Sequence, residues 1–118
     1  MSTQANNFIR ITIPLSVLEH VADLLDAATK EAGGVSVTES HGQWFDDEGK
    51  RHTDTNEQWQ WNFGACKLDA MRALTRAIVD AAFDAGELAV FRERYYDTEC
   101  NLWSWELQGY RADILHAQ

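Results

Sequence analysis

Hydrophobic and polar residues alternate strictly over residues 8–13, where Ile9, Ile11 and Ile13 share one side of the chain. A period of two, built from β-branched residues, predicts a β-strand with one buried face. Pro14 is expected to end this strand, because proline has no backbone N–H to donate to a neighbouring strand.

A helical period follows the strand. Apolar residues recur three and four positions apart over residues 17–28, which predicts an amphipathic helix. Ser16 and Glu19 have the spacing of a capping box, in which each side chain satisfies the backbone amide of the other. Gly33 and Gly34 are expected to end the helix, since glycine takes the left-handed conformation without strain.

The next apolar pattern predicts a long β-hairpin. Strands are expected over residues 35–45 and 50–63, joined by the acidic turn Asp46-Asp47-Glu48-Gly49. A bulge or second turn is expected at residues 54–57, because Asp and Asn favour such sites.

The hairpin register determines one candidate site. A turn that pairs Phe45 with Lys50 places His41 opposite Asp54, on the same face as Glu39. Carboxylates and an imidazole that converge in this way can bind a divalent metal or transfer a proton. The alternative is an exposed polar face with a His–Asp hydrogen bond, since a slip of one residue separates the set.

The second half of the chain repeats the order of helix and hairpin. A helix is expected from Cys66 to Ala85 and strands at residues 88–96 and 102–107. Residues 1–7 are expected to be frayed, and residues 108–118 to form a C-terminal tail with one helical turn.

The predicted order is β-α-β-β-α-β with an extra C-terminal strand. Two helices separated by a hairpin usually pack on one face of an antiparallel sheet. The sequence therefore predicts an α+β chain of one domain, residues 1–118, with a ferredoxin-like two-layer sandwich.

A resemblance to a known family supports this architecture. The first helix, the run Gly33-Gly34-Val35-Ser36-Val37-Thr38-Glu39 and the long Trp-bearing hairpin after it resemble the small regulatory proteins of the PII and CutA type. The resemblance covers about the first half of the chain and rests on the order of elements. It implies a trimeric, non-enzymatic sensor and assigns no ligand residue.

Two Trp-x-Trp pairs each place two indoles on one face of a strand. They are Trp59 with Trp61 and Trp103 with Trp105. Four neighbouring indoles would form an aromatic face that stacks on bases or sugars or anchors a protein partner. The alternative is a core face beneath the helices, because large aromatic residues dominate core burial.

The net charge is −9, from 19 acidic and 10 basic residues. Such a surface repels nucleic-acid phosphates and anionic membranes and attracts basic proteins. The alternative is that the charge serves solubility alone. The candidate partner-binding residues are Asp46, Asp47, Glu48, Asp80, Asp84, Glu87, Asp97 and Glu99. Arg92 and Arg94 share one strand face and are expected to pair with nearby carboxylates.

Motifs specific for catalysis, phosphate binding or cofactor binding do not occur in the sequence. Cys66 and Cys100 match no metal or redox spacing, which favours reduced thiols in a cytoplasmic protein over a disulfide. No apolar run has the roughly 20 residues that a membrane span needs.

These observations favour a non-enzymatic, acidic protein-binding domain without a cofactor. A specific form of this hypothesis is a phage or mobile-element inhibitor that covers the basic surface of a nucleic-acid-binding complex. The alternatives are an oligomeric ferredoxin-like sensor of a small ligand or metal, and an enzyme that uses Glu39, His41 and Asp54.

Overall fold

A computed structural model describes residues 6–97 and 109–118 of the chain. Short 3-10 turns at Leu15–Val17 and Ala65–Lys67 precede the two helices. The main elements are β1 (Asn7–Pro14), α1 (Leu18–Ala32), β2 (Ser36–Phe45), β3 (Arg51–Phe63), α2 (Leu68–Asp84), β4 (Ala89–Tyr96) and β5 (Gly109–His116).

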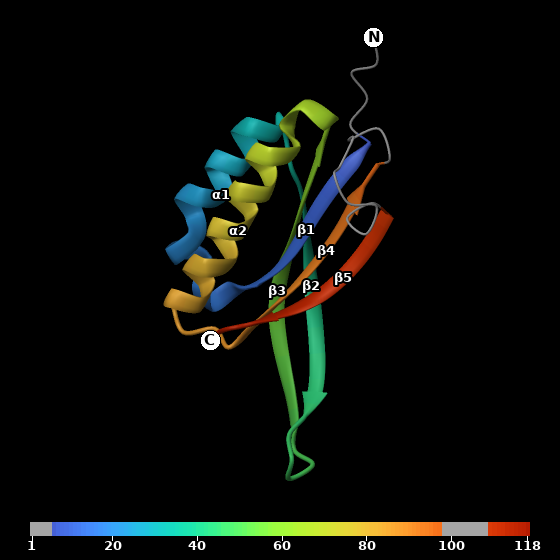
Figure 1. The fold of residues 1–118 in the computed structure, drawn as a ribbon. Helices are drawn as coiled ribbons and strands as arrows, with labels where there is room; N and C mark the ends of the chain where they lie inside the picture. Colours follow the sequence, from blue (N-terminus) through green and yellow to red (C-terminus); the bar gives the residue numbers. More distant parts are fainter. Residues whose placement is uncertain (1–5, 98–108) are drawn as a thin grey trace.

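The described strands form one antiparallel sheet in the order β2-β3-β1-β4-β5. Both helices pack on the same face of this sheet, and the hairpin of β2 and β3 extends beyond them (Figure 1). The expected α+β fold with a ferredoxin-like arrangement of two helices on an antiparallel sheet is therefore confirmed. Neither helix is long and apolar enough to cross a membrane, within the part of the chain that the structure describes.

Strand β1 lies in the centre of the sheet, and its alternation has the expected effect. Ile9, Ile11 and Ile13 are fully buried on the helix side. They meet apolar residues of both helices, among them Val21 and Ile78. The core thus forms between the middle strands and the two helices.

The first Trp pair belongs to this core. Trp61 is completely buried, and its indole Nε1 donates to Thr29 Oγ1 of α1 at 3.0 Å. Trp59 is half-buried and packs against the core, and its Nε1 donates to Glu57. The core alternative is therefore correct for Trp61. Trp103 and Trp105 lie outside the described residues.

Helix α1 begins differently from the prediction and ends as predicted. The capping box is wrong: Ser16 lies inside the 3-10 turn, and α1 begins at Leu18 without a side-chain cap. The tighter turn moves the start of the α-helix two residues past Ser16, so Glu19 no longer occupies the third helical position. Gly33 ends α1 with φ of 91°, and its N–H donates to Thr29 O at 2.9 Å.

The hairpin register differs by one residue from the expected register. Asp46 N–H donates to Lys50 O at 3.0 Å, so Lys50 belongs to the loop and Phe45 pairs with Arg51. Gly49 takes φ of +81°, a left-handed conformation that glycine adopts without strain in this loop. The expected bulge at residues 54–57 is also wrong, since β3 pairs continuously with β2 there.

Both ends of the described chain are more ordered than expected. Asn7 is buried in β1, and its side-chain amide donates to Phe63 O at 3.1 Å. Residues 109–116 form β5, which pairs with β4 along its whole length. The predictions of a frayed Asn7 and of a C-terminal helical turn are therefore wrong. The strand expected at residues 102–107 lies outside the described residues.

Candidate functional site

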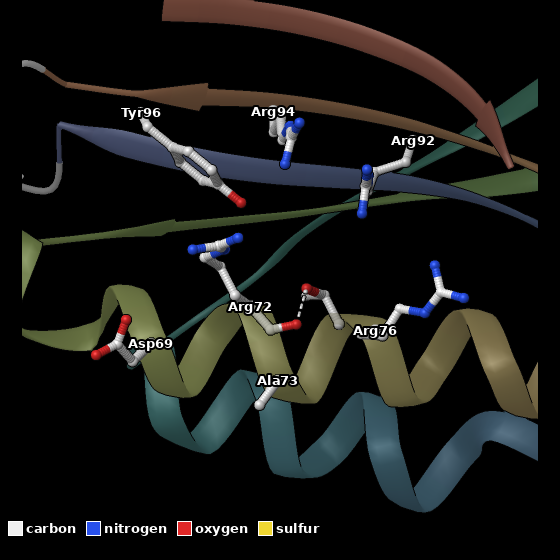
Figure 2. A pocket seen from close by; sticks show the side chains of 8 residues that line it. Asp69, Arg72, Ala73, Arg76, Arg92, Arg94 and Tyr96 are labelled. Atoms are coloured by element: carbon white, nitrogen blue, oxygen red, sulfur yellow. Dashed lines mark hydrogen bonds between the residues drawn. The ribbon is translucent and has the colours of Figure 1, made fainter. Parts of the chain in front are cut away.

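An arginine-lined pocket lies between α2 and β4. It has a volume of about 370 Å³ and a lining of Asp69, Arg72, Ala73, Thr75, Arg76, Arg92, Arg94 and Tyr96. We call it the arginine pocket. Figure 2 shows the arginines of the helix and those of the strand pointing toward one another.

Strand alternation explains the contribution of β4. Arg92 pairs across the sheet with Ile11 and Arg94 with Ile9, so both arginines share the helix side with the isoleucines. Tyr96 lies two residues further along the same face and is buried. Because α2 covers the isoleucines of β1, the arginines of β4 lie at the margin of the core.

Helix α2 supplies Arg72 and Arg76, which lie four residues apart and therefore on one helix face. The Arg72 guanidinium carbon lies 5.9 Å from the centre of the Tyr96 ring, and that of Arg94 lies 5.4 Å from the same ring. Two guanidinium groups thus share one aromatic ring, which favours cations through its π face.

Carboxylates neutralise part of the charge. Asp113 of β5 lies 3.2 Å from Arg92 Nη2 and 3.9 Å from Arg94 Nε, and Asp80 lies 3.2 Å from Arg76 Nε. The expectation that Arg92 and Arg94 pair with carboxylates is confirmed. The Nε atoms of both arginines are nevertheless buried without a hydrogen bond.

The opposite side of the sheet carries three rows of side chains, which we call the open face. The rows follow from the cross-strand pairs of β1, β4 and β5. They are Phe8, Tyr95 and Tyr110 in the first row, Arg10, Glu93 and Ala112 in the second, and Thr12, Phe91 and Ile114 in the third. A charged row therefore runs between two rows rich in aromatic and apolar residues.

Glu93 is the most buried charged residue of the open face, with 8% of its surface exposed. Its carboxylate accepts hydrogen bonds from Arg10 Nε at 3.0 Å, from Arg10 Nη2 at 2.5 Å and from Tyr110 Oη at 2.7 Å. The bidentate Arg10 contact is the main reason that the pKa of Glu93 lies below its usual value. Glu93 is therefore an ionised, oriented carboxylate at neutral pH.

The hydrogen bonds to Glu93 also affect Tyr110 and Arg10, which donate them. Hydrogen bonding to Glu93 raises the pKa of Tyr110, so the phenol remains a proton donor at neutral pH. Arg10 also donates to Gln60 Oε1 at 3.0 Å, which holds its guanidinium between β3 and β4. Phe8 and Tyr95 stack beside this network with ring centres 6.3 Å apart.

The acidic residues expected to bind a partner lie at separate places. Glu87 and Asp97 lie beyond opposite ends of β4, whose eight residues alone span roughly 25 Å at 3.3 Å per residue. Glu99 lies outside the described residues. The others occupy the hairpin tip (Asp46, Asp47 and Glu48) and α2 (Asp80 and Asp84).

The carboxylate of Asp46 makes several hydrogen bonds within the hairpin tip. Its carboxylate accepts from the backbone of Glu48 and Lys50 and lies 2.8 Å from His52 Nε2. The hydrogen bond with His52 is the main cause that lowers the pKa of Asp46. This side chain therefore organises the hairpin turn.

The structure does not bring Glu39, His41 and Asp54 together. His41 Nε2 lies 3.5 Å from Glu39 Oε1. Asp54 pairs with Gly42 and so points to the other face of the hairpin. Asp54 accepts instead from Trp44 Nε1 at 2.9 Å. Among the described residues, no group of three potential ligands is placed to hold a metal ion. Cys66 is an exposed free thiol, and Cys100 lies outside the described residues.

Sequence patterns alone did not identify the arginine pocket or the Glu93 network as sites. One signal was available: Arg72 and Arg76 are spaced for one helix face. Their meeting with β4 depends on tertiary packing, and the Tyr110 contact depends on the pairing of β5 with β4.

Comparison with known proteins identifies the fold in solved structures. No family model matches the chain, the PII and CutA type included, and no curated protein matches its sequence. A phage SAM lyase in complex with S-methyl-5'-thioadenosine superposes with a TM-score of 0.62 and 15% identity, over 99% of this chain and 95% of that chain. A phage SAM lyase in the apo state superposes with a TM-score of 0.55 and 12% identity, over 100% of this chain and 95% of that chain.

These likenesses show that the chain has the fold of a phage enzyme along nearly its whole length. They overturn the expectation of a non-enzymatic binding domain. The absence of a familiar catalytic motif led to that expectation, but a fold without such a motif can still carry a catalytic site. The link to phage proteins agrees with one part of the sequence interpretation.

Proposed function

We propose that this chain is an enzyme that cleaves S-adenosylmethionine at the sulfonium centre. The observation that carries the proposal is the superposition of 99% of the chain on a SAM lyase that binds S-methyl-5'-thioadenosine. Since fold alone does not determine function, the chemistry of the chain's own residues must also suit such a substrate.

The reaction is a carbon–sulfur bond cleavage. S-methyl-5'-thioadenosine is what remains of S-adenosylmethionine when the sulfonium loses its aminocarboxypropyl group. The electron pair of the broken bond goes to sulfur, and the leaving group is a neutral thioether that needs no proton. The carbon that loses sulfur either forms a bond to the substrate's own carboxylate oxygen, which closes a lactone, or becomes part of an alkene as the neighbouring carbon gives up a proton to a base. An enzyme for this step mainly has to bind the sulfonium and orient the four-carbon chain.

The charge of the protein suits this substrate. S-adenosylmethionine carries a sulfonium and an ammonium against one carboxylate, so it is a net cation at neutral pH. A chain with net charge −9 attracts such a molecule and raises its local concentration.

The open face provides groups that suit the two parts of the substrate. Tyr95 and Tyr110 are directly paired and partly exposed, and they offer ring surface for stacking an adenine. Glu93 lies in the next row, and its cross-strand partner on β5 is the small residue Ala112. We assign Glu93 to orienting the cationic part of the substrate, with Arg10 and Tyr110 as its positioning residues.

The test is incubation of the purified full chain with S-adenosylmethionine, followed by chromatography for S-methyl-5'-thioadenosine. Proton NMR of the four-carbon product, whose lactone and alkene forms have the same mass, reports whether the bond breaks by internal attack of the carboxylate or by elimination. The absence of S-methyl-5'-thioadenosine above the uncatalysed background, with folded protein, would overturn the proposal.

The assignment of Glu93 is tested separately with Glu93→Gln, which removes the charge and keeps the shape. We expect kcat/KM to fall at least about 30-fold, equivalent to roughly 2 kcal/mol of transition-state stabilisation. The matched control is Glu48→Gln at the exposed hairpin tip, which should stay within about twofold. Equal effects of the two variants would contradict a role for Glu93 while leaving the reaction itself in place.

A further inference from the structure

The arginine pocket gathers positive charge in a strongly acidic protein. Arg72, Arg76, Arg92 and Arg94 are four of the ten basic residues of the chain. Like charges so close together repel one another unless a counter-charge is present. The carboxylates nearby are Asp69, Asp80 and Asp113, so four guanidinium groups face three carboxylates.

The shortage of negative charge is greatest in the interior of the pocket. Asp80 and Arg76 form an exposed pair on the surface of α2, with about half of each side chain in solvent. Arg92 and Arg94 are largely buried and share the single carboxylate of Asp113. Arg72 makes no ion pair within the described part of the chain, and its charge lies over the ring of Tyr96.

Unused hydrogen-bond donors point to the same conclusion. The Nε atoms of Arg92 and Arg94 are buried and make no hydrogen bond. Buried donors are almost always satisfied, because an unsatisfied one destabilises the folded state, so a donor left without a partner implies a missing acceptor. Figure 2 shows Arg72 directed from α2 toward this part of the strand.

We propose that the arginine pocket binds a small oxyanion, the carboxylate or phosphate group of a metabolite. Guanidinium groups match both groups through paired N–H···O bonds. A volume of about 370 Å³ lies near the lower end of small-molecule sites, which suits a phosphate monoester or a dicarboxylate and is too small for a macromolecular ligand.

This site is distinct from the site proposed for cleavage of S-adenosylmethionine. Arg92 and Arg94 flank Glu93 in the sequence but point to the helix side of the sheet, whereas Glu93 points to the open face. The two proposals therefore stand or fall independently.

Isothermal titration with sodium phosphate and with sodium succinate tests the pocket, each against sodium chloride at equal ionic strength. We expect saturable binding of at least one of the two anions at concentrations of about 0.1–5 mM, the range for a few charged hydrogen bonds. The tighter of the two identifies phosphate or carboxylate as the preferred group. No saturable binding of either anion up to about 20 mM would overturn the proposal.

Variants locate the bound anion. Arg72→Gln should weaken binding about tenfold, since it removes one charged donor. Arg76→Gln at the rim is a second test that leaves the buried arginines in place. The control is Arg51→Gln in the exposed hairpin, which changes the net charge equally and should alter affinity less than twofold.

An effect of Arg51→Gln as large as that of Arg72→Gln would show diffuse attraction and overturn a specific site. Glu93→Gln should leave anion binding unchanged even if it abolishes cleavage of S-adenosylmethionine. Thermal unfolding of each variant confirms that the compared proteins are folded.

Discussion

The indole of Trp61 donates a hydrogen bond of 3.0 Å to the hydroxyl of Thr29, and this contact joins the middle of the sheet to the last turn of α1. The Thr29 hydroxyl in turn donates to Leu25 O at 2.8 Å. A buried donor, the indole N–H, is thereby satisfied in the core.

Thr29→Val should therefore destabilise the protein by about 1–3 kcal/mol, because it leaves the buried indole N–H of Trp61 without an acceptor. Urea unfolding at neutral pH measures the free energy of unfolding. In a Trp61→Phe background the same substitution should cost clearly less, since the donor is gone. An equal cost in both backgrounds would assign the effect to packing around the valine.

Glu93 should make stability depend on pH. Its pKa lies below the ordinary value of 4.5, mainly because of Arg10, so the ionised form stabilises the folded state. This contribution is complete above the unfolded pKa and is lost as pH falls through the folded pKa, below 4.5. Glu93→Gln should cost about 1.5–3 kcal/mol at pH 7 and much less at pH 3.

Measurement of this second prediction requires urea unfolding of wild type and Glu93→Gln at several pH values between 3 and 7. The difference between the two proteins should shrink toward acid. A constant difference would show that ionisation of Glu93 does not contribute to the stability of the folded state.

Gly49→Ala should destabilise the hairpin, because residue 49 takes φ of +81°, where an L side chain is strained. The expected cost is about 1–2 kcal/mol. Gly34→Ala is the matched control: residue 34 does not have a positive φ, and its added Cβ meets nothing within 4 Å. Thermal unfolding should show a lower midpoint for Gly49→Ala and little change for Gly34→Ala.

Asp46→Ala should loosen the hairpin tip, since this carboxylate accepts from the backbone of Glu48 and Lys50 and contacts His52. The pKa of Asp46 is lowered mainly by His52, so the tip should also loosen as pH falls below the ordinary value of 3.8. The amide chemical shifts of residues 48 and 50 report both effects. Unchanged shifts in the variant would contradict this role.

Salt should weaken substrate capture. If the negative charge of the protein attracts a cationic sulfonium substrate, KM rises as sodium chloride goes from about 20 mM to about 500 mM, while kcat changes little. Steady-state kinetics at four salt concentrations checks this. A salt-independent KM would show that the net charge plays no part in binding.

The core pattern of the fold was predictable from the sequence. Ile9, Ile11 and Ile13 alternate cleanly because one side of β1 faces both helices and the other does not. Strand β5 was missed although residues 110–114 also alternate, because the polarity of its two faces is the reverse of that in β1. Its Arg111 and Asp113 face the helix side, while Tyr110 and Ile114 are exposed on the open face.

The hairpin register and the sites depend on contacts that a linear pattern does not contain. One backbone bond, from Asp46 N–H to Lys50 O, moves the whole pairing by a residue and separates Asp54 from His41. The arginine pocket and the Glu93 network each join residues from distant parts of the chain, as with Arg10 and Glu93. Sequence spacing gives no measure of such distances.

The extension of the β2–β3 hairpin beyond the helices has a consequence for cooperativity (Figure 1). Almost every residue of β2 is exposed, so this strand is held chiefly by its backbone bonds to β3. Its outer half therefore forms a local unfolding unit whose amides exchange with solvent long before those of β1. Heating or mild denaturant should detach this outer half first, and the rest of the described sheet with its two helices should unfold afterwards as one body.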